Sequence, residues 1–166
     1  MRVPIRKPGK YTNLKTDFHI TREKFAELKD KLEKLRKISR PRAAALVKDL
    51  STTGDFSENA GYQMAKGRLR GINQRILDME EMIKNAVIIE SGKSSGIVRL
   101  GSTVTVEMLG RQKKYKILGS SETDPERGVI SHNSAVGRGL LGQRVGDTVK
   151  IQLGDKEVIY KIIKIE

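Results

Sequence analysis

Two carboxylates stand close together in a stretch of small and polar residues. Asp55 and Glu58 lie three positions apart within residues 54–62, GDFSENAGY. Mg²⁺ often takes one or two carboxylates and completes its shell with water and substrate phosphate, so this pair could finish a metal site begun by another molecule. The same spacing also fits a helix capping box, with acids at the positive end of a helix. Both interpretations stay open, because one residue can cap the helix while the other points outward.

Apolar residues on both sides of this stretch follow heptad-like spacings, which predict two helices that pack along narrow seams. The first seam contains Phe25, Leu28, Leu32, Leu35, Ala43, Leu46 and Leu50, with a weak point at Ser39. The second seam contains Tyr62, Ala65, Leu69, Ile72, Ile76, Met79 and Ile83. An antiparallel hairpin centred on Gly54 pairs Phe25 with Ile83, Leu32 with Ile76, Ser39 with Leu69, Ala43 with Ala65, and Leu46 with Tyr62. Arms of about 30 residues would make a rod roughly 45 Å long.

Local signals mark where these helices begin and where they are weak. Thr21 is a good N-cap, with Glu23 in the first turn. Pro41 removes a helical hydrogen bond and should kink the first arm. Glycines in an exposed helix interior cost about 1 kcal/mol each, so packing must hold the second helix, which contains Gly61, Gly67 and Gly71.

After the helices, the apolar period changes to two, which is typical of strands. Alternation is visible in residues 104–108, 115–117 and 149–153, and a turn at Gly154-Asp155 leads into residues 158–165. Ser134 can cap a short helix over residues 135–141. We therefore predict an α+β fold with four segments: a basic flexible arm (1–20), a coiled-coil hairpin (21–86, tip at 52–58), a linker (87–96) and a small, mostly antiparallel β domain with one short helix (97–166).

The composition favours an anionic partner. The chain has 33 Lys and Arg against 20 Asp and Glu, a formal net charge of +13, although a merely soluble basic protein would also show this excess. There are no cysteines, no Trp and only 4% aromatic residues, which argues against disulfides and against base-stacking platforms. We find no apolar run of membrane length and no signal peptide, and expect a cytoplasmic protein.

Several polar groups need a functional and a structural interpretation. The basic residues near the tip fit either a solvated helix surface or a stalk that contacts phosphates; they are Arg40, Arg42, Lys48, Lys66, Arg68, Arg70 and Arg75. The run Ser131-His132-Asn133-Ser134 favours a cap and a turn over nucleophilic catalysis. His19 has no partner at metal-ligand spacing and is expected to be a surface residue.

Three stretches resemble the bacterial Gre transcript-cleavage factors, GreA and GreB. GDFSENAGY resembles the family's GD-x-x-EN-x-x-Y tip, residues 39–42 (SRPR) resemble an RRPE-like element, and DPERGVISHNSAVGRGLLGQRVGD (124–147) is similar to the C-terminal signature, with a lean towards GreA. The resemblance covers residues 20–166 and leaves the basic arm outside. Ala135 and Arg42 depart from the family, which often has proline and an acid at these positions.

The resemblance implies a coiled-coil hairpin followed by an FKBP-like domain. It implies a transcription elongation factor that enters the secondary channel of RNA polymerase and stimulates cleavage of the 3′ end of backtracked RNA. Asp55 and Glu58 would hold Mg²⁺ shared with the polymerase, and Asn59 and Tyr62 would support the tip. Such a protein is a monomeric cofactor of the polymerase's own endonucleolytic activity and not an enzyme; its partners would be RNA polymerase, the nascent RNA 3′ end and DNA.

Three other classes of protein also fit parts of this sequence. A channel-binding inhibitor without cleavage activity should have a remodelled tip, whereas Asp55, Glu58 and Asn59 are intact. A prolyl isomerase would need an aromatic-lined pocket, and residues 97–166 offer only Tyr115 and Tyr160. A nonspecific nucleic-acid binder is favoured by charge alone.

Overall fold

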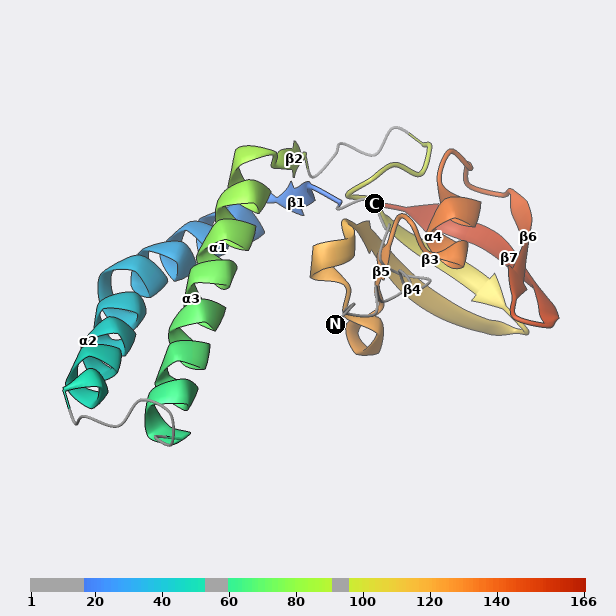
Figure 1. The fold of residues 1–166 in the computed structure, drawn as a ribbon. Helices are drawn as coiled ribbons and strands as arrows, with labels where there is room; N and C mark the ends of the chain where they lie inside the picture. The colour runs from blue at the N-terminus through green and yellow to red at the C-terminus, as the bar shows by residue number, and fades with distance from the viewer. Residues whose placement is uncertain (1–16, 53–59, 91–95) are drawn as a thin grey trace, which may run out of the picture.

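The N-terminal half of the protein is a helical hairpin. The structure, a computed structural model, describes residues 17–52, 60–90 and 96–166. The first arm contains α1 (Arg22–Lys34), the π-helical segment η1 (Leu35–Ser39) and α2 (Arg40–Ser51), and the second arm is α3 (Ala60–Lys84). The arms lie side by side and run in opposite directions (Figure 1). The predicted helical hairpin is confirmed, but the 25 residues of α3 correspond to about 37 Å, which is shorter than the expected length of roughly 45 Å.

A narrow apolar seam joins the two arms. Ala43, Ile72 and Ile76 form its buried centre, and Leu32, Leu35 and Leu69 pack against them. Ala65 is also buried. The predicted centre at Gly54 lies outside the described residues. The helix ends at Ser51 and Ala60 put the midpoint of the connection at residues 55–56.

The first arm changes direction between α1 and α2, next to Pro41 (Figure 1). Pro41 cannot donate a backbone hydrogen bond, and its ring crowds the carbonyl four residues earlier. The preceding turn is wider, because the Arg40 N–H donates to the Leu35 carbonyl five residues back. The prediction of a kink at Pro41 therefore corresponds to a π-helical turn just before the proline.

Leu46 departs from the predicted seam after this turn. We expected it to pack there against Tyr62, but it is 42% exposed, and the neighbouring Val47 is half-buried instead. Ala43 is buried and Leu50 is half-buried, as predicted. Spacings of four and then three residues keep one helix face as well as three and then four, so Val47 replaces Leu46 between Ala43 and Leu50. The prediction that Leu46 lies in the seam was therefore wrong.

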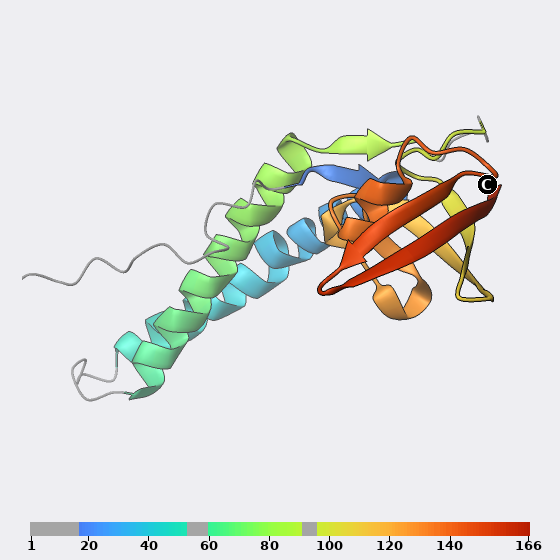
Figure 2. The same cartoon turned by 90° about the vertical axis from the view of Figure 1, so that its right-hand side faces the viewer.

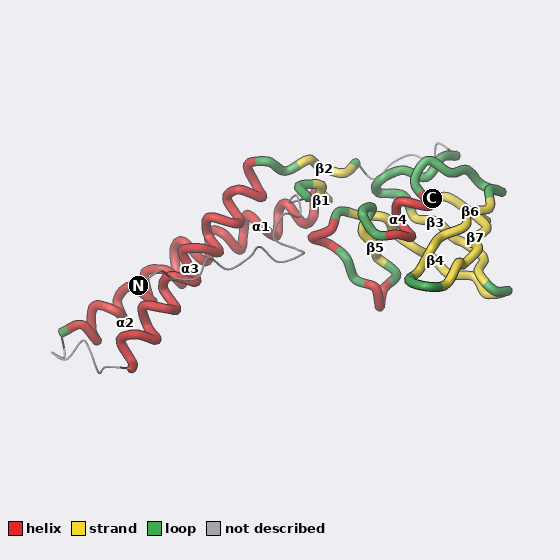
Figure 3. The backbone as a smooth tube through the Cα atoms, turned by 45° about the vertical axis from the view of Figure 1, so that its right-hand side comes forward, coloured by secondary structure: helices red, strands yellow, loops and turns green. Residues whose placement is uncertain are grey.

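The C-terminal part is a five-stranded sheet with one short helix. The strand order is β5-β4-β3-β7-β6; all neighbours are antiparallel except β4 and β5 (Figure 3). The elements are β3 (Thr103–Met108), β4 (Arg111–Leu118), β5 (Val129–Ser131), α4 (Ala135–Leu140), β6 (Thr148–Leu153) and β7 (Lys156–Ile165), with the 3₁₀ turns η2 (Ser120–Glu122) and η3 (Pro125–Arg127) between β4 and β5. The predicted α+β fold class is confirmed.

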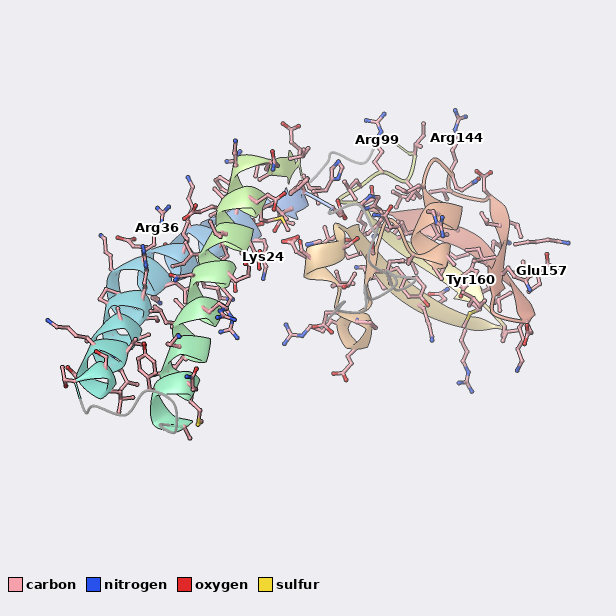
Figure 4. The ribbon with its side chains drawn as sticks, in the orientation of Figure 1. Lys24, Arg36, Arg99, Arg144, Glu157 and Tyr160 are labelled. Carbon is pink, nitrogen blue, oxygen red and sulfur yellow. The ribbon has the colours of Figure 1, made fainter. Side chains whose placement is uncertain are left out.

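Alternating residues of the strands form the core of this domain. Val104, Val106 and Ile117 are fully buried, as the period of two predicted, and Tyr160 from β7 is 2% exposed (Figure 4). The helix α4 closes the core with Leu140 and is capped at Ser134, whose hydroxyl accepts a hydrogen bond from Gly137 N–H at 3.0 Å. The predicted cap is therefore confirmed.

A two-stranded parallel ribbon connects the hairpin to the sheet domain. β1 (His19–Thr21) pairs with β2 (Val87–Ile89), and both strands lie between the helices and the sheet (Figure 2). Ile20 at its centre is completely buried. The sequence analysis placed residues 17–20 in the arm and residues 87–89 in the linker, and it did not predict that these segments pair. Three-residue strands carry too short a pattern to reveal a partner far away in the sequence.

The Glu122 carboxylate links this ribbon to the sheet domain through hydrogen bonds. Glu122 accepts hydrogen bonds from the Thr21 hydroxyl at 2.6 Å and from the Thr21 N–H at 3.2 Å. The Thr21 hydroxyl also caps α1 by accepting a bond from Lys24 N–H at 3.2 Å, as predicted. Beside it, Gly119 approaches the ribbon so closely that a Cβ atom there would lie 1.8 Å from the His19 carbonyl oxygen. The start of the first arm is therefore fixed on the sheet domain.

We predict that Glu122→Ala destabilises the protein by about 1.5–3 kcal/mol, because the buried Thr21 would lose charge-assisted hydrogen bonds. Chemical denaturation measures the change, and hydrogen exchange at residues 19–21 locates it. The control is Glu126→Ala in the neighbouring 3₁₀ turn, where the side chain is exposed. Equal stability of the two variants would contradict this role of Glu122.

We further predict that Gly71→Ala increases the free energy of unfolding by about 0.5–1 kcal/mol. A Cβ atom at Gly71 meets no atom within 4 Å, and alanine has the higher helix propensity. Thermal unfolding followed by circular dichroism measures the change. A loss of stability would show that the second arm needs glycine at this position.

Candidate functional site

The basic residues predicted near the tip gather in one half of the hairpin. We call residues 40–51 and 60–75 the outer half, and residues 22–39 and 76–84 the inner half. The outer half lies at the end of the hairpin away from the sheet domain (Figures 1 and 2). All six predicted contact residues are exposed there: Arg40, Arg42 and Lys48 on α2, and Lys66, Arg68 and Arg70 on α3.

The two halves differ sharply in charge. The outer half has seven basic residues, which are these six and Arg75, and its one acidic residue is Asp49. The inner half has eight basic and seven acidic residues. The net charge of the hairpin is therefore concentrated in the outer half.

Ion pairs reinforce this difference. In the inner half, Glu27 pairs with Lys24 and Lys31, Glu33 pairs with Lys37, and Arg36 bridges the two arms to Glu80 at 2.5 Å (Figure 4). Hydrogen bonds from Lys31 and Lys24 lower the pKa of Glu27 to about 2. Among the residues that the structure describes, the seven cations of the outer half form no ion pair with a carboxylate. Their charge is therefore available to an anionic partner.

Some of these cations have defined positions. Arg42 from α2 and Arg68 from α3 line the same groove between the arms, so both guanidinium groups can reach one partner. The Lys66 ammonium lies 5.2 Å from the centre of the Tyr62 ring. This cation–π contact orders two side chains in the first turns of α3.

The two carboxylates that motivated the functional hypothesis belong to residues 53–59, outside the described part of the chain. Asn59 belongs to the same segment. The structure does define the ends of this segment, because α2 ends at Ser51 and α3 begins at Ala60. The segment is therefore carried between the ends of two paired helices.

Sequence reasoning missed a cluster of polar side chains at the end of the hairpin next to the sheet domain, which we call the root of the hairpin. His19 was expected to be a surface residue with no partner at metal-ligand spacing. Its side chain is 41% exposed, but it does have partners: its Nδ1 lies 2.9 Å from Asp17 Oδ1, and its ring centre lies 5.3 Å from that of His132. His132 also lies near Asp17, with 3.4 Å between Nδ1 and Oδ2. A possible signal is that the chain has only two histidines, but nothing in their spacing shows that they meet.

The described helices include none with the length and apolar character needed to span a membrane.

The family models and the relatives that match this chain all belong to one protein family. Residues 18–88 match the model of "Transcription elongation factor, N-terminal", and residues 93–166 match "Transcription elongation factor, GreA/GreB, C-term". The transcription elongation factor GreA of Bacillus licheniformis is 40% identical over 151 residues, covering 89% of this chain and 96% of the relative. GreA of Macrococcus caseolyticus is 38% identical over 155 residues, with coverages of 92% and 98%.

Two solved structures are also similar to this chain, at lower sequence identity. GreA factor homolog 1 of Thermus thermophilus is 26% identical with a TM-score of 0.41, and it covers 89% of this chain and 97% of its own. A GreA/GreB factor of Nitrosomonas europaea is 20% identical with a TM-score of 0.39, and the coverages are 78% and 94%. The two family models and the sequence relatives, which span most of the chain, show that the protein belongs to the GreA/GreB family of transcription elongation factors.

Proposed function

We propose that this elongation factor inserts its hairpin into the secondary channel of RNA polymerase and stimulates cleavage of backtracked RNA. The observation that carries the proposal is the charge pattern of the hairpin. Its outer half has seven cations that form no ion pair with a carboxylate of the described residues, and the segment with Asp55 and Glu58 connects the ends of that half. A rod of about 37 Å is long enough to carry this segment away from the sheet domain. The sheet domain would then rest on the rim of the channel.

Asp55 and Glu58 would supply carboxylate oxygens to Mg²⁺ shared with the polymerase. Their donor set fits this ion, because Mg²⁺ prefers oxygen ligands and keeps positions for water and substrate phosphate. Bound there, Mg²⁺ would lower the pKa of a water molecule and offset the charge of the scissile phosphate. Two carboxylates are too few for a closed protein site, so they would act only beside ligands of the polymerase. The chain is then a cofactor of the polymerase and not an enzyme by itself.

The cations of the outer half would contact the extruded RNA. Arg42 and Arg68 line one groove and could hold neighbouring phosphates of a single strand. Tyr62 and Lys66 would support the tip from the first turns of α3. The basic surface alone would also bind DNA, so specificity would come from the fit of the hairpin to the channel.

A prolyl isomerase finds no support in the sheet domain. Tyr160 is buried in its core, where burial and the neighbouring Tyr115 raise the pKa of its hydroxyl. Among residues 96–166, all of which are described, the apolar groove beside Leu109 and Ile159 has no aromatic residue in its lining.

The first test changes the two acids without changing their shape. Asp55→Asn and Glu58→Gln should each reduce the rate of RNA cleavage in stalled, backtracked complexes by about 100-fold or more, equivalent to about 2.7 kcal/mol of transition-state stabilisation. Binding to the polymerase, measured by competition, should be retained. Asp49→Asn, in the last turns of α2, is the matched control and should cleave normally.

The outcomes separate the remaining classes. Normal cleavage by both tip variants would show that the acids only cap a helix. A wild-type protein that binds the polymerase and cleaves no RNA would instead be a channel-binding inhibitor.

The second test concerns the outer half. Arg42→Ser combined with Arg68→Ser should weaken binding of a short single-stranded RNA and reduce the slope of log affinity against log salt by about 1.4, since each phosphate contact contributes about 0.7. Fluorescence anisotropy over a range of salt concentrations measures the slope. Lys31→Ser with Lys37→Ser is the control of equal charge, because both lysines are paired in the inner half. Equal slopes for the two double variants would contradict an RNA contact at Arg42 and Arg68.

A further inference from the structure

Both histidines of the chain meet at one carboxylate. Asp17 and His19 stand at the start of β1, whereas His132 follows β5, more than a hundred residues later. Their nitrogen and oxygen atoms lie within 4.8 Å of one another, with 2.9 Å from Asp17 Oδ1 to His19 Nδ1 and 3.4 Å from Asp17 Oδ2 to His132 Nδ1. In the described part of the chain, this is the one such group of three potential metal ligands.

The carboxylate is held in place by the backbone. Asp17 accepts hydrogen bonds from Ser120 N–H at 2.6 Å and from His19 N–H at 3.1 Å, and its side chain is only 6% exposed. Burial opposes ionisation, but these hydrogen bonds and that of the His19 ring outweigh it and lower the pKa of Asp17 to about 2. Among the described residues, its ion-pair partners are the two histidines, with no lysine or arginine. The buried carboxylate is therefore stabilised first by the backbone N–H of Ser120, and its side-chain neighbours are the two imidazole rings.

The spacing of the donor atoms fits a tetrahedral metal ion. Ligand atoms about 2.0–2.1 Å from Zn²⁺ lie about 3.3 Å apart. The nitrogen–oxygen distances of 2.9 Å and 3.4 Å, which run to the two oxygens of Asp17, are of similar size. The side chains of His19 and His132 are 41% and 19% exposed, which leaves a path from solvent and room for water as a fourth ligand. Two imidazoles and one carboxylate suit zinc, nickel or copper, whereas Mg²⁺ prefers oxygen ligands alone.

We propose that Asp17, His19 and His132 form a binding site for Zn²⁺ at the root of the hairpin. A ring nitrogen that binds the ion carries no proton, so each neutral imidazole that binds through Nδ1 would keep its proton on Nε2. The ion would also link β1, which leads directly into the first arm, to the loop after β5 in the sheet domain. Bound Zn²⁺ thus fixes the hairpin on the sheet domain. This site is independent of Asp55 and Glu58 and of the proposed function.

The experiment uses the full chain without a histidine tag, so that the two imidazoles give the only histidine signals. Zn²⁺ should bind with a stoichiometry of one per chain in calorimetry, shift the ring signals of both histidines in NMR spectra, and raise the melting temperature. Asp17→Asn, His19→Gln and His132→Gln should each weaken binding at least tenfold. Glu126→Gln, an exposed acid on η3, is the matched control and should bind like the wild type.

The exposed position of His19 keeps the test valid if Asp17→Asn does not fold, because His19→Gln removes a ligand at the surface. Amide spectra of each variant verify the fold. The proposal is overturned if Zn²⁺ leaves both ring signals unchanged, if the two histidine variants bind as tightly as the wild type, or if Mg²⁺ competes equally well.

Discussion

The narrow seam between the two arms is the interaction on which the hairpin depends. Neither arm could remain helical alone in this composition, because the second arm contains glycines at exposed positions and the first arm is interrupted before Pro41. Packing of Ala43 against Ile72 and Ile76 compensates for both weaknesses. The seam therefore combines one small side chain from α2 with two large apolar side chains from α3. Glu122 then sets its direction by holding Thr21 at the start of the first arm.

The charges of the hairpin are divided between its two halves. Ion pairs within and between the arms occupy the inner half, where they add small increments of helix stability. The outer half has almost no acids, and its cations face solvent. A membership in the GreA/GreB family gives this pattern a meaning, since a positive rod with two carboxylates in its end segment suits a crowded, phosphate-rich channel. In the proposed function, the inner half would serve the stability of the hairpin and the outer half would contact the anionic partner.

Much of this architecture was readable from the sequence, because it rests on periodic patterns. The seam through Ile72 and Ile76, the alternation of Val104 and Val106, and the Ser134 cap all follow from local spacing. The contacts that sequence reasoning missed are those between distant segments: the β1–β2 pair, the bond of Glu122 to Thr21, and the cluster of Asp17 with His132. The replacement of Leu46 by Val47 in the seam was also missed, because both residues are apolar and both lie at helical spacing from Ala43 and Leu50.

In the proposed function, the hairpin acts by carrying the segment between α2 and α3 to a fixed distance from the sheet domain. Removing one heptad from each arm, residues 25–31 and 77–83, would shorten the rod by about 10 Å while leaving the end segment and the sheet domain intact. Circular dichroism would verify that the shortened hairpin is still helical, and competition would verify that it still binds RNA polymerase. The account predicts that the shortened protein fails to stimulate cleavage of backtracked RNA. Cleavage at the wild-type rate would contradict it.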